Sequence, residues 1–237
     1  MKKVLLIILL FTTAIASAQD AKLGILKRLT TRVDLFTDIW QFKNDSIKPG
    51  KVNPGISFYI MLDNPIGEGN KTPWSYAIGA GITSENLYNN VLIGYKVNTS
   101  NIYETYFYKV PLKTPAPNST AVTYKKDKMV FSYLDLPFEL RFRTDNGFKV
   151  AVGAKYGLLM GFHTKYRGTD PEGKLGTVKL KTSSTTNMQT SRYGATFSVG
   201  YKGLMVNGYY QLSKVFKDGV GPDMYPISLG ISLHPFK

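Results

Sequence analysis

Two carboxylates with a fixed spacing are the first residues that could do chemistry. Asp135 and Glu139 share one face of a segment in which polar and apolar residues alternate. Paired carboxylates can hydrolyse glycosides, but along a strand these backbones would be about 13 Å apart, which is wide even for an inverting enzyme. Arg141 on the same face and Lys155 in the next predicted strand supply opposite charges. We therefore interpret Asp135, Glu139, Arg141 and Lys155 as a structural ion network.

The chain has two histidines and no cysteine, so it forms no disulfide and offers few metal ligands. His163 is predicted to point inward near the outer rim, where it could be the base of a lipid hydrolase or acyltransferase if a nucleophile and an acid stood nearby. His234 is far along the chain, and no Gly-x-Ser-x-Gly motif or phosphate loop occurs. We predict no catalytic, cofactor or metal site.

Strands must position these side chains, because apolar and polar residues alternate with a period of two in eight segments. In the clearest segment, Leu136 and Phe138 alternate with Pro137 and Glu139. The predicted strands are residues 32–42, 55–63, 74–84, 134–142 (beginning near 129), 148–162, 193–201, 204–212 and 227–233.

The connections alternate between long and short. The long ones are residues 43–54, 85–128, 167–189 and 215–225, and the short ones are 64–73, 145–147 and 202–203. Outer-membrane barrels have long extracellular loops and short periplasmic turns. We predict an all-β fold: a single antiparallel up-and-down transmembrane β-barrel of eight strands. Residues 89–110 could extend a loop or add two strands, so a ten-stranded barrel is the alternative.

The predicted lumen is narrow and polar. An eight-stranded barrel has room only for side chains, so we expect a plugged barrel and no diffusion pore. A three-residue turn, 145–147, would place Glu139 opposite Gly153 and Asp135 opposite Gly157, with Lys155 bridging both carboxylates. Aromatic residues near strand ends are predicted to form outward girdles at the membrane interfaces: Trp40, Trp74, Tyr76, Phe148, Tyr201 and Tyr210.

The first 18 residues have the three parts of a secretory signal peptide. Lys2 and Lys3 precede an apolar core, and we expect cleavage between Ala18 and Gln19, leaving a barrel domain over residues 19–237. Losing the two lysines lowers the formal net charge from +14 to +12. Export removes nucleic acid as a partner, so the basic connections suit solvent, phosphate-bearing lipid headgroups or acidic polysaccharide.

Three segments carry a family resemblance. Residues 133–140 (YLDLPFEL), 150–157 (VAVGAKYG) and 227–233 (ISLGISL) resemble the PorT-like outer-membrane β-barrel family of Bacteroidetes, most closely over 131–162. Asp135 stands where that family commonly has Glu, and the chain ends HPFK instead of in a terminal aromatic residue. The resemblance implies an outer-membrane barrel, and some relatives serve protein secretion and gliding machinery. It thus implies envelope or secretion-machinery proteins as partners, beside outer-membrane lipids.

These observations favour a small non-enzymatic outer-membrane barrel that acts as a scaffold or interaction protein through its extracellular loops. One alternative is an outer-membrane lipid-modifying enzyme with His163 as base. The other is a soluble periplasmic, lipocalin-like barrel that binds an apolar ligand. The last alternative requires the apolar strand faces inside the barrel and the charges outside.

Overall fold

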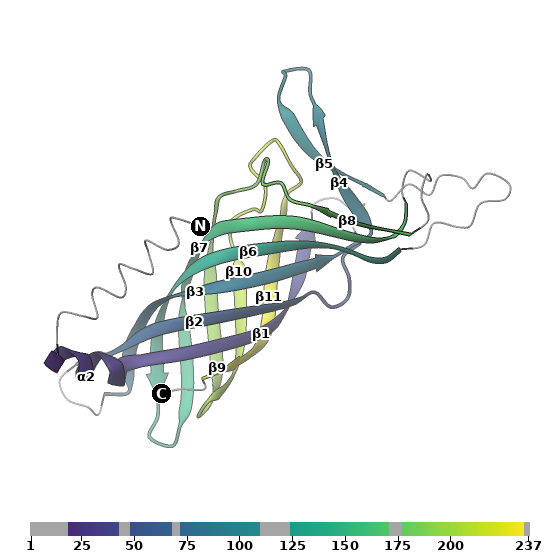
Figure 1. Cartoon of the computed structure of the whole chain (residues 1–237). Coiled ribbons are helices and arrows are strands. Elements are labelled where there is room, and N and C mark those ends of the chain that lie inside the picture. Colours follow the sequence, from purple (N-terminus) through teal and green to yellow (C-terminus); the bar gives the residue numbers. More distant parts are fainter. Residues whose placement is uncertain (1–18, 43–47, 68–71, 110–123, 171–176, 235–237) are drawn as a thin grey trace.

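A computed structural model describes residues 19–42, 48–67, 72–109, 124–170 and 177–234 (Figure 1). Eight antiparallel strands form a closed barrel, as predicted. They are β1 (Leu29–Phe42), β2 (Pro54–Pro65), β3 (Trp74–Tyr88), β6 (Tyr124–Arg143), β7 (Phe148–Thr169), β9 (Ser191–Tyr201), β10 (Leu204–Gln211) and β11 (Met224–Leu233). The pairing of β6 with β7 closes the ring.

A helix, α2 (Gln19–Arg28), precedes β1, and the predicted signal peptide with Ala18 lies outside the described residues. No helix within the described ranges is long and apolar enough to cross a membrane.

The alternation of side chains places apolar residues outside and polar residues inside. The Phe138 side chain is 50% exposed on the outer surface, whereas its neighbour Glu139 is only 2% exposed. The same pattern leaves an apolar belt around the barrel wall, formed among others by Leu35, Ile56, Ile78, Phe197 and Ile231. The lipocalin-like interpretation needed the reverse arrangement and is wrong.

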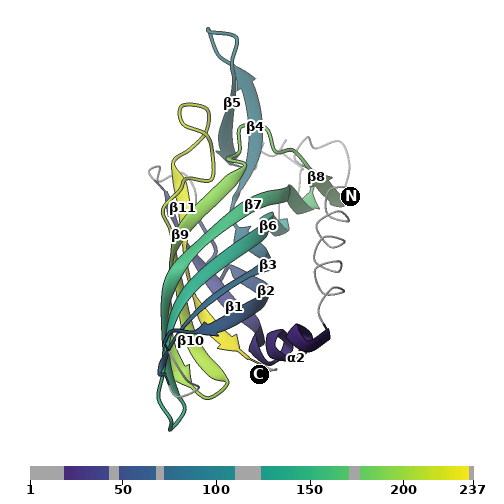
Figure 2. The same cartoon turned by 90° about the vertical axis from the view of Figure 1, so that its left-hand side faces the viewer.

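Residues 89–109 do not join the barrel, and Val110 of the predicted segment lies outside the described residues. They contain β4 (Val91–Val97) and β5 (Tyr103–Lys109), which pair only with each other in a two-stranded sheet. This hairpin stands above one end of the barrel (Figure 2). The ten-stranded alternative is therefore wrong. A further short strand, β8 (Thr177–Thr182), pairs with the end of β7.

The predicted register of β6 and β7 is confirmed. Glu139 lies opposite Gly153 and Asp135 opposite Gly157. In the turn, the Thr144 N–H donates to the Phe148 carbonyl oxygen over 2.9 Å. Gly147 has φ = 96°, a left-handed conformation that glycine adopts without strain.

A β-bulge changes the facing of the extracellular half of β7. The register shifts between Ser132 and Tyr133 of β6, which pair with Gly161 and Leu159 and leave Met160 unpaired. An extra residue reverses the facing of all that follow. Phe162 is therefore buried inside and His163 lies on the outer side, both opposite to the prediction.

The position of Trp40 also corrects the predicted girdle. Trp74, Tyr76, Phe148, Tyr201 and Tyr210 are exposed on the outer surface, but Trp40 is buried inside. On β1 the outward residues have odd numbers, such as Leu35 and Ile39, so an even-numbered tryptophan must point into the barrel. Its ring centroid lies 5.3 Å from that of Phe131.

Candidate functional site

The lumen contains two clusters of ionised side chains, and Arg192 is the centre of the first. Arg192 of β9 is 1% exposed. Its Nη2 donates to Asp135 Oδ2 over 2.9 Å, and its Nη1 forms an ion pair with Glu85. The guanidinium carbon also lies 3.7 Å from the centroid of the Tyr133 ring. One arginine thus joins carboxylates from β3 and β6 across the barrel.

Lys155 completes this first cluster. Its Nζ lies 3.6 Å from Asp135 Oδ2 and 3.8 Å from the centroid of the Tyr209 ring. The Thr83 hydroxyl donates to the same Asp135 oxygen over 2.5 Å. Two cations therefore balance the carboxylates of Asp135 and Glu85, as buried charges require.

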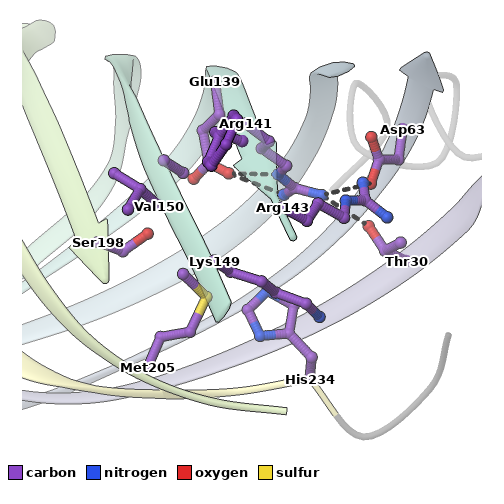
Figure 3. A pocket seen from close by; sticks show the side chains of 12 residues that line it. Thr30, Asp63, Glu139, Arg141, Arg143, Lys149, Val150, Ser198, Met205 and His234 are labelled. Carbon is purple, nitrogen blue, oxygen red and sulfur yellow. Dashed lines mark hydrogen bonds and ion pairs between the residues drawn. The ribbon is translucent and has the colours of Figure 1, made fainter. Parts of the chain in front are cut away.

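The second cluster lies nearer the short turns and combines three arginines with three carboxylates: Arg32, Arg141, Arg143, Asp34, Asp63 and Glu139. Glu139 accepts from Arg32 and, over 2.7 Å, from Arg141. Asp63 accepts from Arg141 over 3.2 Å and from Arg143. Figure 3 shows Arg141 between the two carboxylates.

The four residues proposed as an ion network all point into the lumen, but their pairing differs from the proposal. Lys155 pairs with Asp135, whereas arginines occupy Glu139, so the predicted double bridge is wrong. Gly157 makes room for the contact between Asp135 and Arg192. A Cβ atom there would collide with the Asp135 carboxylate and the Arg192 side chain.

Sequence reasoning missed several members of these clusters. Arg32 and Asp34 have the inward parity of β1, so alternation could have identified them. Glu85 was placed in a loop because the predicted strand stopped at residue 84, whereas β3 continues to Tyr88. Which charges meet across the lumen depends on barrel curvature, which alternation does not describe.

A small cavity lies at the end of the barrel that carries the short turns. It has a volume of about 40 Å³, and its lining includes Arg141, Lys149, Met205 and His234 (Figure 3). Ligand sites are commonly 300–1,000 Å³, so this cavity has space for roughly one water molecule. Burial lowers the pKa of His234 to about 4, and the nearby Arg141, Arg32 and Lys149 add to the effect. The imidazole is therefore neutral at pH 7.

His163 does not have the surroundings of a catalytic base. Partial burial lowers the pKa of its imidazole, and the charges of Lys165, Lys181 and Lys128 lower it further. A hydrolytic base needs an orienting acid, and the charged side chains of the described residues that act on His163 are all lysines. In the described part of the chain, no group of three or more His, Cys, Asp or Glu residues could hold a metal ion.

An apolar cluster fills the lumen at the opposite end, where the long connections lie. Its members come from the barrel wall and from three connections: Trp40, Leu87, Val91, Met129, Phe131, Tyr133, Phe162, Met188, Val215, Phe216 and Met224. Phe131 and Phe162 meet across β6 and β7 with ring centroids 5.0 Å apart. The long connections thus fold inward and seal the barrel over the first ion cluster.

The same cluster anchors the β4–β5 hairpin. Val91 is one of its members, and Ile93 and Phe107 pack against it. Phe107 meets Phe216 edge to face, with ring centroids 6.0 Å apart. The hairpin and the residues that close the lumen therefore belong to the same apolar cluster.

Asn187 fastens the hairpin to two other connections. Its side-chain amide donates to the Tyr103 carbonyl oxygen over 2.6 Å, to Thr105 Oγ1 over 3.1 Å and to the Val220 carbonyl oxygen over 3.3 Å. The Thr105 N–H also donates to the Val220 carbonyl oxygen, over 2.7 Å. With both packing and hydrogen bonds at its base, the hairpin has a defined orientation above the barrel.

The outer half of the hairpin exposes apolar and aromatic side chains. The Tyr103 side chain is 60% exposed, and Val97, Ile102 and Tyr106 are also exposed. Val97 lies directly opposite Tyr103, so these two share a face. Interfaces are enriched in exposed tyrosines on rigid supports. We call Val97, Ile102, Tyr103 and Tyr106 the hairpin tip.

A family of known proteins matches this chain and agrees with this architecture. The family described as outer membrane protein beta-barrel domain matches residues 50–217. A search of curated proteins gives no match. Among solved structures, the chain is similar to Ail, the attachment invasion locus protein of Yersinia pestis, at 12% identity over 87% of this chain and 97% of that one, with a TM-score of 0.37. A porin of Rhodopseudomonas blastica shows 8% identity over 87% of this chain and 99% of that one, with a TM-score of 0.22.

Proposed function

Because this chain belongs to the outer membrane protein beta-barrel domain family and is a protein of the bacterial outer membrane, we propose that it is a sealed scaffold that presents its hairpin tip to an extracellular partner. The apolar cluster carries the proposal, since the residues that close the lumen also hold the base of β4 and β5. A protein that conducts solutes would need an open lumen. A mobile loop would not need its base to be packed against the apolar cluster.

The contents of the barrel support binding over catalysis. The carboxylates of Asp135 and Glu139 are both occupied by cations, and His163 lies among lysines on the outer side. Among the residues that the structure describes, the lipid-modifying alternative therefore has no assembled set of nucleophile, base and acid in its favour. We propose a non-enzymatic role without cofactor or metal.

The resemblance of residues 131–162 to the PorT-like family supports a partner in the cell envelope. In this proposal, secretion-machinery proteins are the first candidates. Residues 1–18 direct export in the same proposal, with cleavage before Gln19.

Site-specific photocrosslinking in whole cells tests the role of the hairpin tip. A benzoylphenylalanine at Val97 or Tyr103 should give the same discrete adduct, because these two residues lie directly opposite each other and share one face of the hairpin. The matched control replaces Tyr193, which is nearly as exposed as Tyr103 but lies on the apolar belt, and should give lipid adducts alone. Adducts that are identical at all three positions, or absent from both tip positions in folded protein, would contradict the proposal.

A further inference from the structure

A second surface lies on the outer side of the barrel, apart from the hairpin. Five cations gather where the extracellular ends of β6, β7 and β8 are paired: Lys128, Lys165, Arg167, Lys179 and Lys181. Lys128 is directly opposite Lys165, which is opposite Lys181 in turn, and Arg167 is opposite Lys179. We call these five residues the basic patch. Figure 1 shows the ends of β6 and β7 beside β8, beyond the rim formed by β1 and β2.

The bulge in β7 directs the patch outward. Below the bulge the even-numbered residues of β7 face outward, and above it the odd-numbered residues do. Lys165 and Arg167 are therefore exposed, while Tyr166 between them is buried. Without the extra residue at Met160, both cations would point toward the apolar cluster. Bulges commonly redirect side chains in this way, and here the result is a single-sign surface.

Four of the five residues of the patch have no counter-charge among the described residues. Like charges directly opposite each other destabilise a sheet. Lys165, Arg167, Lys179 and Lys181 are all exposed, and none forms an ion pair with a carboxylate of the described ranges. Lys128 donates to the Asn86 amide oxygen over 2.5 Å, which fixes the position of its ammonium group. A bound anion would relieve this repulsion.

The height of the patch matches lipid headgroups. Outward residues of β6 run from Phe142 to Ser132, which is about 33 Å along the strand and about 25 Å in height at the tilt of such barrels. That height equals the apolar band of outer-membrane barrels. Lys128 lies four residues beyond Ser132, about 10 Å higher. The patch thus faces sideways just above the hydrocarbon, on the same side of the strands as the apolar belt.

From this placement we infer that the basic patch binds the phosphate groups of glycolipid headgroups in the outer leaflet. Ammonium and guanidinium groups form strong charge-assisted hydrogen bonds with phosphate. A soluble polyanion would more readily meet a surface that faces away from the membrane than this sideways surface just above the apolar belt. The inference depends on residues other than the hairpin tip and stands independently of the proposed partner.

Native mass spectrometry of the detergent-solubilised protein tests the inference. The probes are diphosphoryl lipid A, lipid A stripped of both phosphates, inorganic phosphate and heparin. The test variant combines Lys165→Gln, Lys179→Gln and Lys181→Gln. The matched control combines Lys48→Gln, Lys51→Gln and Lys217→Gln, which removes three exposed lysines from other long connections.

We expect wild type and the control variant to retain diphosphoryl lipid A, and the test variant to bind it roughly tenfold more weakly or worse. Without lipid, the test variant should be at least as stable as wild type, because repulsion is reduced. Equal lipid binding by all three proteins, equal binding of the dephosphorylated lipid, or displacement by inorganic phosphate at the same concentration as lipid A would overturn the inference. Patch-dependent binding of heparin without lipid A would overturn it in favour of a soluble polysaccharide.

Discussion

Replacing Arg192 should destabilise the barrel far more than replacing Lys155, although both are buried cations beside Asp135. Arg192 donates to Asp135 at distances of 2.9, 3.1 and 3.3 Å and also pairs with Glu85. Methionine at position 192 leaves Glu85 without its cation, and an unpaired buried charge costs about 3–5 kcal/mol. Lys155 Nζ is 3.6 Å from Asp135 Oδ2, which is beyond hydrogen-bond distance. When Lys155 is replaced, Asp135 still accepts hydrogen bonds from Arg192 and Thr83. Lys155→Met should therefore cost about 1–2 kcal/mol.

The free energy of unfolding can be measured by urea titration of the protein refolded in phospholipid vesicles, with the buried Trp40 as a fluorescent probe. The double variant Arg192→Met/Glu85→Gln is the control, because it removes the stranded charge and should recover about half of the loss. A Lys155→Met cost equal to that of Arg192→Met would contradict the pairing. Losses below about 1 kcal/mol in both would show that water screens the lumen.

Three further predictions concern the start, the wall and the mouth of the barrel. Mass spectrometry of the protein from its native envelope should find Gln19 as the first residue, and an intact Met1 would refute the signal peptide. Phe138→Arg on the apolar belt should reduce insertion by about 2–4 kcal/mol near the midplane, whereas Lys202→Arg in a short turn should have no effect on folding yield in vesicles. Burial raises the pKa of Asp127, at the extracellular end of β6, to about 7. The folded protein therefore keeps this carboxyl protonated at pH values where the unfolded chain has lost the proton, and the free energy of unfolding should fall as pH rises from about 4 to about 7. Asp127→Asn should remove this dependence and gain at most about 4 kcal/mol at pH 8 in urea titrations.

Alternation predicted the barrel because its period depends only on which side of a strand each residue occupies. The alternating lengths of the connections then predicted an up-and-down order for all eight strands. The odd or even position of each residue predicted the register of β6 and β7. The same rule applied to an even-numbered Trp40 would have placed it inside. Alternation predicts the facing of side chains along a strand only until a bulge inserts one extra residue.

The bulge at Met160 is such an insertion, and the sequence gives no strong sign of it. It reversed the facing of His163 and brought Lys165 and Arg167 to the outer side. One partner of Glu139 could not be predicted from the sequence, because Arg32 lies on β1, which is not adjacent to β6 in the sheet. Contacts across the lumen depend on the curvature of the barrel and on side-chain rotamers, and alternation predicts neither. The β4–β5 hairpin was recognisable as two strands, but its separate pairing depends on the apolar cluster below it.

Ionic conductance of the purified protein in planar bilayers tests the sealed barrel most directly. Two ion clusters and an apolar cluster occupy the lumen, so we expect insertion without conductance steps in 1 M KCl. A porin reconstituted in the same bilayers supplies the positive control. Stable, long-lived channels formed by folded wild-type protein would contradict the sealed scaffold.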